Sequence, residues 1–547
     1  MKRNFDGLAD TEFDLLIIGG GITGSCIARD AASRGLKVAL VEKNDFSSAT
    51  SAGPSKLIHG GLRYLRNFEL GLVRESLAER RIWERIAPHQ VRPLAFLLPA
   101  DKKSKSTLNI GLTLYDLLSL DRNKVKDPEQ KLPGHKWLNA EAAKKAEPVL
   151  GGQEMEGAFV YYDCQMRSPE RLCLECLIDA DRHGAVVTNY AEATGFLREG
   201  KRILGAEVFD RVTGIEISVR ARITVNAAGP WADSLLGLAQ QGEPTRHLLR
   251  SKGIHLITRQ LTSGHAVMAA ISKEMGGGHM FLLPWRGKTI IGTTDTAYEG
   301  DPDELEVTPR EINAYLSVIN RTISGIGLTR DDVVHAYAGL RPLIQDKAEK
   351  KNPYNASRKS EVVDHQKEDR LKGLFSAIGG KWTTSRYVAE NAVNAIAKRL
   401  KRKLPASRTA ETPLPGGKFD ALSPFFDAMN ERYPELSGAR LDELVFTYGS
   451  EMDSVAAFAS ESAALAERLA PNRGEIGAQV VHAVREEMAF TLEDVVFRRT
   501  GLGTLGYPGD EALARVTQIM AREFGWDKAQ IEEELRGVKR LFYAERT

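Results

Sequence analysis

Residues 13–24 have the sequence FDLLIIGGGITG, and this stretch decides the fold of the first part of the chain. The apolar run Phe13 to Ile18 predicts a buried parallel strand, and a helix is expected next, over residues 25–34. A second apolar strand is expected over residues 37–41, and it ends at Glu42. A strand, a glycine-rich turn, a helix and a second strand in this order predict a βαβ unit.

The glycine-rich turn has the spacing G-x-G-x-x-G that is typical of a dinucleotide site. Gly19 permits a tight turn, Gly21 allows the backbone to approach a pyrophosphate, and Gly24 lets helix and sheet pack closely. The N–H groups at the start of the helix would face the phosphates. Glu42, 18 residues after Gly24, can accept both ribose hydroxyls. We therefore predict a dinucleotide site, and the alternative is a tight turn without a ligand.

Two later segments favour FAD over NAD. Each is an apolar strand that ends in small residues, where the backbone can pass close to a cofactor: Ala228 and Gly229 in the first, Gly379 and Gly380 in the second. The second leads into a helix N-terminus, which can stabilise negative charge on a reduced flavin. An NAD site is usually one continuous unit, whereas these elements span about 360 residues.

The composition is that of a globular protein with balanced charge. The 547 residues include 75 Lys and Arg and 73 Asp and Glu, a formal net charge of +2, and 42% are hydrophobic. This balance argues against nucleic acid as a partner but allows a local cluster of cations around an anionic substrate. Cys173 and Cys176 lack further ligands at metal-site spacing, so we expect no metal and interpret them as buried structural thiols.

The sequence also bears on localisation. No uncharged apolar run reaches the roughly 20 residues that a bilayer requires, and acidic residues precede the first apolar stretch, unlike in a signal peptide. Four cysteines are too few for a disulfide framework, so we expect a reduced, cytoplasmic protein. Leu108 to Leu120, with basic residues on both sides, is either an interfacial segment or a core helix.

Later segments predict a second sheet. Residues 203–210 and 215–220 are expected to form a hairpin, followed by a separate third strand over 223–226. The short apolar runs between residues 253 and 294 have no helices between them, which favours antiparallel pairing.

The expected fold class is α/β plus α. A Rossmann-like FAD-binding domain is interleaved with a largely antiparallel β substrate domain over residues 1–404. Residues 405–418, rich in proline and glycine, are expected to be a linker, and residues 419–547 an all-helical C-terminal domain.

Several motifs carry a resemblance to a known family. They are SKLIHGGLRYL from Ser55, NAAGPWAD from Asn226, AGLRPL from Ala338, GGKWTT from Gly379, AVREE from Ala483 and RRTGLG from Arg498. In these motifs the chain resembles the FAD-dependent, aerobic-type glycerol-3-phosphate dehydrogenases of the D-amino-acid-oxidase-like superfamily. It departs from many relatives at residues 52–54, where Ala-Gly-Pro replaces a serine-rich stretch and Pro54 lacks an N–H donor.

The resemblance implies oxidation of sn-glycerol 3-phosphate to dihydroxyacetone phosphate by hydride transfer to the flavin, with the electrons passed to a quinone. An oxidase that uses O₂ is the alternative, although such relatives usually carry an insertion for which 547 residues leave little room. A non-catalytic flavin-binding scaffold is the third hypothesis. Peripheral attachment to the inner face of the cell membrane and a homodimer are left open.

The resemblance also implies the site residues. Ser55 is expected at the flavin, and the substrate contacts are expected to be Arg63, Tyr64, His255, Arg341, Arg358, Lys381 and Thr384. The arginines would give bidentate hydrogen bonds to the phosphate, and Lys381 a point charge.

The identity of the catalytic base is a separate question. His59 is the preferred base, because an ordinary histidine pKa of about 6.5 suits proton abstraction near neutrality. His255 is the competitor, and Lys381 shares the role if Arg341 lowers its pKa.

Overall fold

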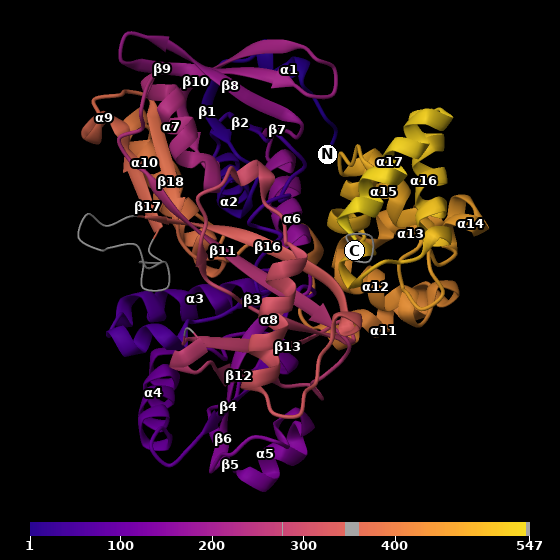
Figure 1. The fold of residues 1–547 in the computed structure, drawn as a ribbon. Helices are drawn as coiled ribbons and strands as arrows, with labels where there is room; N and C mark the ends of the chain where they lie inside the picture. Colours follow the sequence, from indigo (N-terminus) through magenta and orange to yellow (C-terminus); the bar gives the residue numbers. More distant parts are fainter. Residues whose placement is uncertain (276, 345–359, 543–547) are drawn as a thin grey trace.

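The computed structural model describes residues 1–275, 277–344 and 360–542. Two sheets and a helical region make up the molecule (Figure 1). The first sheet is at the upper left of this view, the second lies below it, and the helical region is at the right. Both sheets combine segments that are far apart in the sequence.

The first sheet is the expected dinucleotide-binding sheet. Its strand order is β17-β18-β10-β1-β2-β7, and all neighbours are parallel except β17 and β18. The strands are β1 (Phe13–Ile18), β2 (Val38–Val41), β7 (Val186–Thr188), β10 (Glu216–Asn226), β17 (Ser360–Asp364) and β18 (Leu374–Gly379). Apolar side chains of α2 (Ile22–Ser33), α6 (Pro169–Arg182) and α10 (Ser385–Leu400) pack against it. The predicted βαβ unit is therefore present, with its helix beginning at Ile22 rather than at residue 25.

One strand differs from the sequence-based expectation. The second strand of the predicted hairpin (215–220) and the predicted third strand (223–226) are a single strand, β10. Its first half pairs antiparallel with β9 (Arg202–Asp210), which also pairs with β8 (Ala191–Glu199), and its second half pairs parallel with β1. Arg220 and Arg222 interrupt the apolar pattern, but both lie on the exposed face of the strand. The strand therefore continues through them with its ordinary alternation.

The second sheet is largely antiparallel, as predicted. Its strands are β3 (Leu57–Ile58), β4 (Val91–Ala100), β5 (Lys136–Asn139), β6 (Gly157–Met166), β11 (Leu248–Thr258), β12 (Ala266–Ala270), β13 (His279–Trp285), β14 (Lys288–Gly292), β15 (Thr296–Ala297) and β16 (Val333–Ile344). Only β12 and β4 pair in parallel among the described pairs. One face of this sheet packs against α8 (Pro309–Thr322) and α5 (Ala140–Ala146).

Helix α4 (Lys105–Leu118) lies at the outer edge of the molecule beside α3 (Leu70–Ile86) (Figure 1). Within α4 only Leu112 and Tyr115 are buried, whereas Ile110 is 69% exposed and Leu117 is 56% exposed. The helix therefore has one face in an apolar core, with Leu112 and Tyr115, and one exposed face with apolar side chains, so it is not a fully buried core helix.

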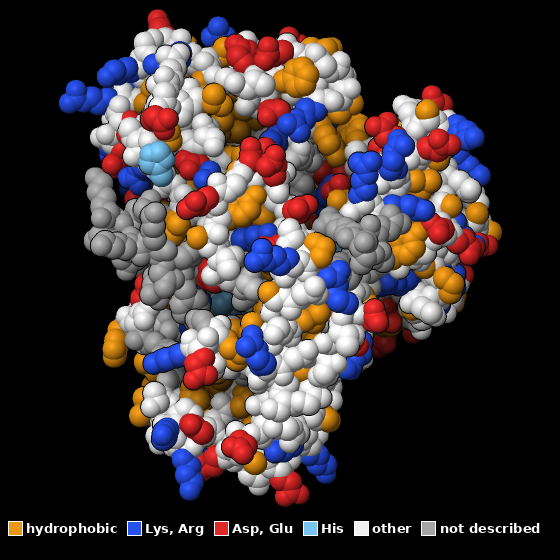
Figure 2. Space-filling model, in the orientation of Figure 1, with side chains coloured by type: hydrophobic (Ala, Val, Ile, Leu, Met, Phe, Trp, Pro, Cys, Tyr) orange, Lys and Arg blue, Asp and Glu red, His pale blue; other side chains and the backbone are white. Residues whose placement is uncertain are grey.

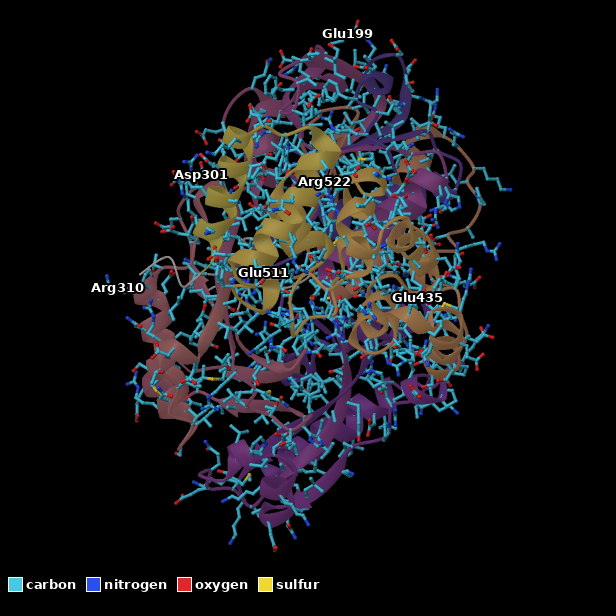
Figure 3. The ribbon with its side chains drawn as sticks, turned by 90° about the vertical axis from the view of Figure 1, so that its right-hand side faces the viewer. Glu199, Asp301, Arg310, Glu435, Glu511 and Arg522 are labelled. Carbon is cyan, nitrogen blue, oxygen red and sulfur yellow. The ribbon has the colours of Figure 1, made fainter. Side chains whose placement is uncertain are left out.

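The C-terminal region is helical, as predicted. Its helices are α11 (Leu422–Arg432), α12 (Ala439–Tyr448), α13 (Met452–Glu461), α14 (Ala463–Ala466), α15 (Gly477–Glu486), the π-helical turn η13 (Asp494–Arg499), α16 (Asp510–Phe524) and α17 (Lys528–Leu541). Figure 3 shows these helices, in orange and yellow, covering one side of the molecule, with Glu435, Glu511 and Arg522 on their outer surface. Two apolar clusters form the interior of this region.

The surface carries charges of both signs. Figure 2 shows blue and red side chains interspersed over one face, in keeping with the balanced composition. Among the described residues, no helix combines the length and the apolar character that crossing a bilayer requires.

Candidate functional site

A cavity of about 1550 Å³ lies between the carboxyl ends of the parallel strands of the first sheet and one face of the second sheet. This is where ligands bind in open α/β sheets. The predicted site residues that line it are Gly19, Gly21, Glu42, Ser55, His59, Arg63, Tyr64, Ala228, Gly229, His255, Arg341, Gly379, Gly380 and Lys381. The fold therefore brings most of the predicted residues together.

The glycine-rich turn connects β1 to α2 at one end of the cavity. Gly19 has φ +114°, and a Cβ there would lie 2.5 Å from the carbonyl oxygen of Ala227 at the end of β10. A Cβ at Gly24 would lie 1.9 Å from the carbonyl oxygen of Gly19. Gly24 does not line the cavity, but its missing side chain allows α2 to begin directly over the turn. The turn thus leaves a backbone-lined cradle at the helix N-terminus.

Glu42 follows β2 and lines the same end of the cavity. Its carboxylate accepts hydrogen bonds from the N–H groups of Gly20 (2.7 Å) and Asn44 (3.0 Å). Burial raises the pKa of Glu42, and these two donors oppose the shift. The two hydrogen bonds fix the carboxylate at the position where a ribose acceptor is expected.

A hydroxyl-rich segment beside the cradle was not among the predicted residues. Ser47, Ser48, Thr50 and Ser51 all line the cavity. Ser51 Oγ accepts a hydrogen bond from the N–H of Ile22 (2.9 Å), and the N–H of Ser47 donates to the carbonyl of Gly20 (3.2 Å). The signal in the sequence was the run of hydroxyl residues that begins five residues after Glu42, the acid predicted to bind the ribose.

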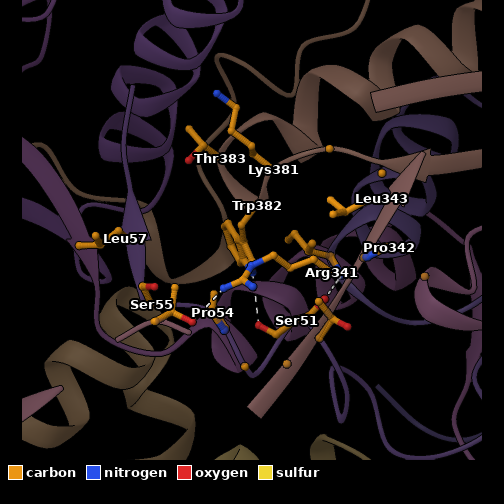
Figure 4. Close-up of a pocket in the computed structure, with 18 of the residues that line it drawn as sticks. Ser51, Pro54, Ser55, Leu57, Arg341, Pro342, Leu343, Lys381, Trp382 and Thr383 are labelled. Atoms are coloured by element: carbon orange, nitrogen blue, oxygen red, sulfur yellow. Dashed lines mark hydrogen bonds between the residues drawn. The ribbon is translucent and has the colours of Figure 1, made fainter. Parts of the chain in front are cut away.

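Arg341 enters the cavity from β16. Its guanidinium donates to Thr293 Oγ1 (2.8 Å) and Ser251 Oγ (3.2 Å), and it lies 3.7 Å from Asp295 Oδ1. A Cβ at Gly253 on the neighbouring strand β11 would lie 2.3 Å from the guanidinium, so the glycine makes room for it. Figure 4 shows Arg341 with Trp382 and the segment that contains Ser51 and Ser55.

Lys381 reaches the cavity from the loop after β18. Its Nζ donates to Ser76 Oγ and lies 4.5 Å from the ring centroid of Tyr64, and the Arg63 guanidinium lies 5.0 Å from the same centroid. Burial lowers the pKa of Lys381 to about 8, helped by the positive charge of Arg63 and opposed by Glu75. The neighbouring cation is thus Arg63, rather than Arg341 as the sequence-based argument supposes.

His59 lies close to these cations. Its backbone N–H donates to Thr383 Oγ1 (3.2 Å). Burial lowers the pKa of His59 to about 4, and the charges of Lys381 and Arg63 add to the shift. The imidazole is therefore neutral at pH 7 and able to accept a proton.

Asp163 on β6 is a cavity residue that the sequence-based reasoning missed. Its Oδ1 accepts hydrogen bonds from Arg80 Nη1 (2.6 Å), the Tyr115 hydroxyl (2.9 Å) and the N–H of Gly60 (3.2 Å). Because Gly60 follows His59, this buried network fixes the backbone at the histidine. A buried carboxylate is costly unless it is hydrogen-bonded, so a single aspartate within an apolar strand predicts such a network.

His255 on β11 is buried at the cavity wall. Its Nε2 shares a hydrogen bond with Ser55 Oγ (2.8 Å), and its ring stacks on Tyr337 with centroids 4.8 Å apart. Burial lowers its pKa well below the ordinary value, and the charges of Arg341 and Lys56 contribute. Ser55 therefore contacts the competing histidine directly.

Besides Gly24, two predicted residues are not placed at the cavity. Thr384 is buried and its hydroxyl donates to the carbonyl of Lys381 (3.4 Å), whereas the neighbouring Thr383 lines the cavity. Arg358 lies outside the described residues. The four cysteines are buried free thiols.

The residues present fit a flavin dinucleotide. The cradle at Gly19 and Gly21, the fixed carboxylate of Glu42 and the hydroxyl-rich segment match the chemistry of an adenosine diphosphate moiety. The small residues after β10 and β18 line the same continuous cavity, which extends to the cations and His59. The fold and the site together define an oxidoreductase that uses FAD.

Comparisons with known proteins agree with this class. Residues 14–394 match the family model described as FAD dependent oxidoreductase, and residues 407–531 match the model of the C-terminal domain of alpha-glycerophosphate oxidase.

Similar proteins align with nearly the whole chain. A glycerol-3-phosphate dehydrogenase of Synechocystis is 36% identical over 98% of this chain and 97% of its own length. The mitochondrial enzyme of Bos taurus is 35% identical over 98% of this chain and 74% of its own. The structure of the Bacillus halodurans glycerol-3-phosphate dehydrogenase complexed with FAD superposes with a TM-score of 0.77, at 29% identity, over 98% of this chain and 95% of that one. The chain belongs to the family of FAD-dependent glycerol-3-phosphate dehydrogenases.

Proposed function

We propose that this chain oxidises sn-glycerol 3-phosphate to dihydroxyacetone phosphate, with FAD as the hydride acceptor and a quinone as the final electron acceptor. The observation that carries the proposal is that Arg63, Arg341 and Lys381 all line the cavity that contains the dinucleotide cradle. Cations at this position would bind the phosphate and hold the alcohol carbon in a reactive orientation. The names of the similar proteins support the substrate assignment.

We assign the phosphate to Arg341 and Arg63, with Lys381 as a third positive charge. Hydroxyl groups fix Arg341, and the Tyr64 ring lies against both other cations. Cations fixed by neighbouring side chains lose little entropy when the phosphate arrives. The hydrogen bond proposed for Thr384 fits Thr383 better, because Thr383 lines the cavity. Arg358 stays a proposed phosphate contact.

We assign the proton acceptor to His59. Bound FAD supplies the hydride acceptor, so the protein has only to remove the hydroxyl proton. His59 is neutral at pH 7, with a pKa of about 4, and an anionic substrate would raise that pKa toward the useful range. Lys381, with a pKa of about 8, is mostly charged at pH 7 and serves as a cation. His255 shares its Nε2 with Ser55 and serves as a wall of the site.

The electron acceptor and the membrane are linked through α4. Exposed apolar residues of α4 and the following turn, Ile110, Leu117 and Leu120, form a surface that suits the membrane interface. Leu108 and Leu114 of the same helix line the cavity. A quinone is itself dissolved in lipid, so a helix that borders both regions supports quinone over O₂. Binding to anionic vesicles that is lost in the double variant Ile110→Ser and Leu117→Ser tests the attachment.

We also propose residues 405–418 as the boundary between the catalytic region and the helical domain. This segment, which the structure describes throughout, has no strand or α-helix, contains the 3-10 helix η10 (Pro415–Gly417), and packs on the catalytic region: Arg29 donates to the carbonyls of Thr409 (3.3 Å) and Thr412 (2.7 Å). Limited proteolysis within the segment, followed by separation of the fragments, tests the boundary.

An anaerobic titration tests the activity. Glycerol 3-phosphate should bleach the flavin absorbance stoichiometrically, and glycerol, which lacks the phosphate, should not at the same concentration. A soluble quinone should reoxidise the reduced flavin faster than air does. Hydrogen peroxide formed in step with substrate turnover would favour the oxidase instead, and an unbleached flavin would favour the scaffold.

A further inference from the structure

The helical C-terminal region contacts the segment that borders the cofactor cradle. Asp45 lies three residues after Glu42 and two residues before the hydroxyl-rich segment 47–51. In the structure Asp45 is fully buried at the junction with the π-helical turn η13. The helical region stands beside the β7 edge of the first sheet, and β7 pairs with β2, the strand that precedes this segment (Figure 1).

The Asp45 carboxylate accepts four side-chain hydrogen bonds. Arg499 donates through Nη1 and Nη2, both at 2.8 Å, and Arg498 donates through Nε at 2.7 Å. The fourth donor is Asn189 Nδ2 at 3.0 Å, which also donates to the carbonyl of Met488 (2.8 Å). Three of the four bonds thus come from two consecutive residues that lie more than 450 positions later in the chain.

The arginines are held in turn by the helical region. Arg499 Nη2 donates to the carbonyl of Glu487 (2.9 Å), and Arg498 donates to Asp494 Oδ1 (2.6 Å) and Glu493 Oε1 (2.6 Å). Burial by itself raises the pKa of Asp45, but the two arginines outweigh it and hold the pKa below its ordinary value. The carboxylate is therefore ionised and tied to one position.

Hydrogen bonds of the segment after Asp45 connect this residue to the cradle. The N–H of Ser48 donates to the carbonyl of Asp45 (3.3 Å), and the N–H of Ser47 donates to the carbonyl of Gly20 (3.2 Å). Ser51 Oγ accepts from the first N–H of α2, that of Ile22. Segment 42–51 is thus fixed at Asp45 on one side and at the glycine turn on the other.

We propose that Asp45 is a positioning residue through which Arg498 and Arg499 of the helical region hold segment 42–51 in the conformation that binds FAD. The proposal rests on FAD binding and is independent of the substrate and of the electron acceptor. It gives the helical region a role in the cofactor site, although η13 contributes no residue to the cavity lining. Affinity falls in proportion to the fraction of molecules whose binding segment is in the competent conformation, so loosening Asp45 weakens FAD binding.

The test compares Asp45→Asn with Glu475→Gln. Glu475 is also fully buried and pairs with Arg286 across the junction of the helical region with the second sheet, away from segment 42–51. FAD is removed from each protein and its dissociation constant is measured by quenching of flavin fluorescence. We expect a rise of about tenfold to 100-fold in Asp45→Asn and less than threefold in Glu475→Gln, with the KM for glycerol 3-phosphate unchanged in both at saturating FAD. The unfolding midpoint of each apoprotein is measured in parallel.

Two results would overturn the proposal: an unchanged FAD dissociation constant in Asp45→Asn, or an equal rise in both variants, which would indicate general destabilisation. If Asp45→Asn does not fold, Arg499→Lys replaces it, since lysine keeps the charge but not the paired hydrogen bonds. The same rise in the dissociation constant is then required, and its absence refutes the proposal.

Discussion

Replacing Arg341 by alanine should lower kcat/KM for glycerol 3-phosphate by about 100-fold. The guanidinium is already oriented by Thr293, Ser251 and Asp295, so no reorganisation is needed before it binds a phosphate. A hydrogen bond to a charged group contributes about 1.5–3 kcal/mol. With 24% of the side chain exposed, water can replace part of the interaction, so we take about 3 kcal/mol for two bonds rather than the upper limit. At 1.4 kcal/mol for each factor of ten, this predicts about 100-fold.

The assay is anaerobic steady-state reduction of a soluble quinone, with glycerol as a second substrate. KM should rise and kcat should fall together with glycerol 3-phosphate, because the arginine both binds the phosphate and orients the alcohol carbon. With glycerol, wild type and variant should agree within about threefold, since no phosphate contact is lost. Arg246→Ala, which removes a surface arginine paired with Glu361, is the control. Unchanged kcat/KM in the Arg341 variant would refute its assignment to the site.

Three further predictions concern the same site. The rate constant kcat/KM should fall above about pH 8 as Lys381 loses its charge, and Lys381→Arg should move this fall to higher pH; a fall at the same pH in the variant would exclude Lys381. His59→Asn should lower kcat by about 10²- to 10⁴-fold while the flavin absorbance is retained, and a kcat within threefold of wild type would leave the base to another group. Glu42→Gln should weaken FAD binding by about tenfold, because one charge-assisted hydrogen bond to the ribose is lost. The dissociation constant is measured by flavin fluorescence, and equal affinities would mean that the carboxylate does not reach the ribose.

The cofactor end of the site was predictable because its signals are local. A glycine spacing, a strand and an acid lie within 30 residues, and together they favour a dinucleotide site over a tight turn without a ligand. The length of β10 was not predictable in the same way, because Arg220 and Arg222 interrupt its apolar run. Only the pairing with β9 and β1 shows that their side chains lie on an exposed face.

The substrate end depended on the resemblance, because its described residues come from four separate segments. The sequence alone could not show that Thr383 rather than Thr384 faces the cavity, since this depends on the direction of one short turn. Asp163 was missed because its partners, Arg80 and Tyr115, are on helices whose packing is not encoded in local spacing. The sequence likewise could not show that the charge of Arg63, rather than that of Arg341, adds to the effect of burial on the pKa of Lys381.

The interleaving of the first sheet also governs how the protein is made. β1 is synthesised early, but its partner β10 follows about 200 residues later, and β18 about 360 residues later. Contacts between such distant segments form slowly and leave apolar strand edges exposed meanwhile. A nascent chain therefore carries the glycine turn long before the cavity can close around a flavin. Cofactor loading should be one of the last events of maturation, after nearly the whole chain has left the ribosome.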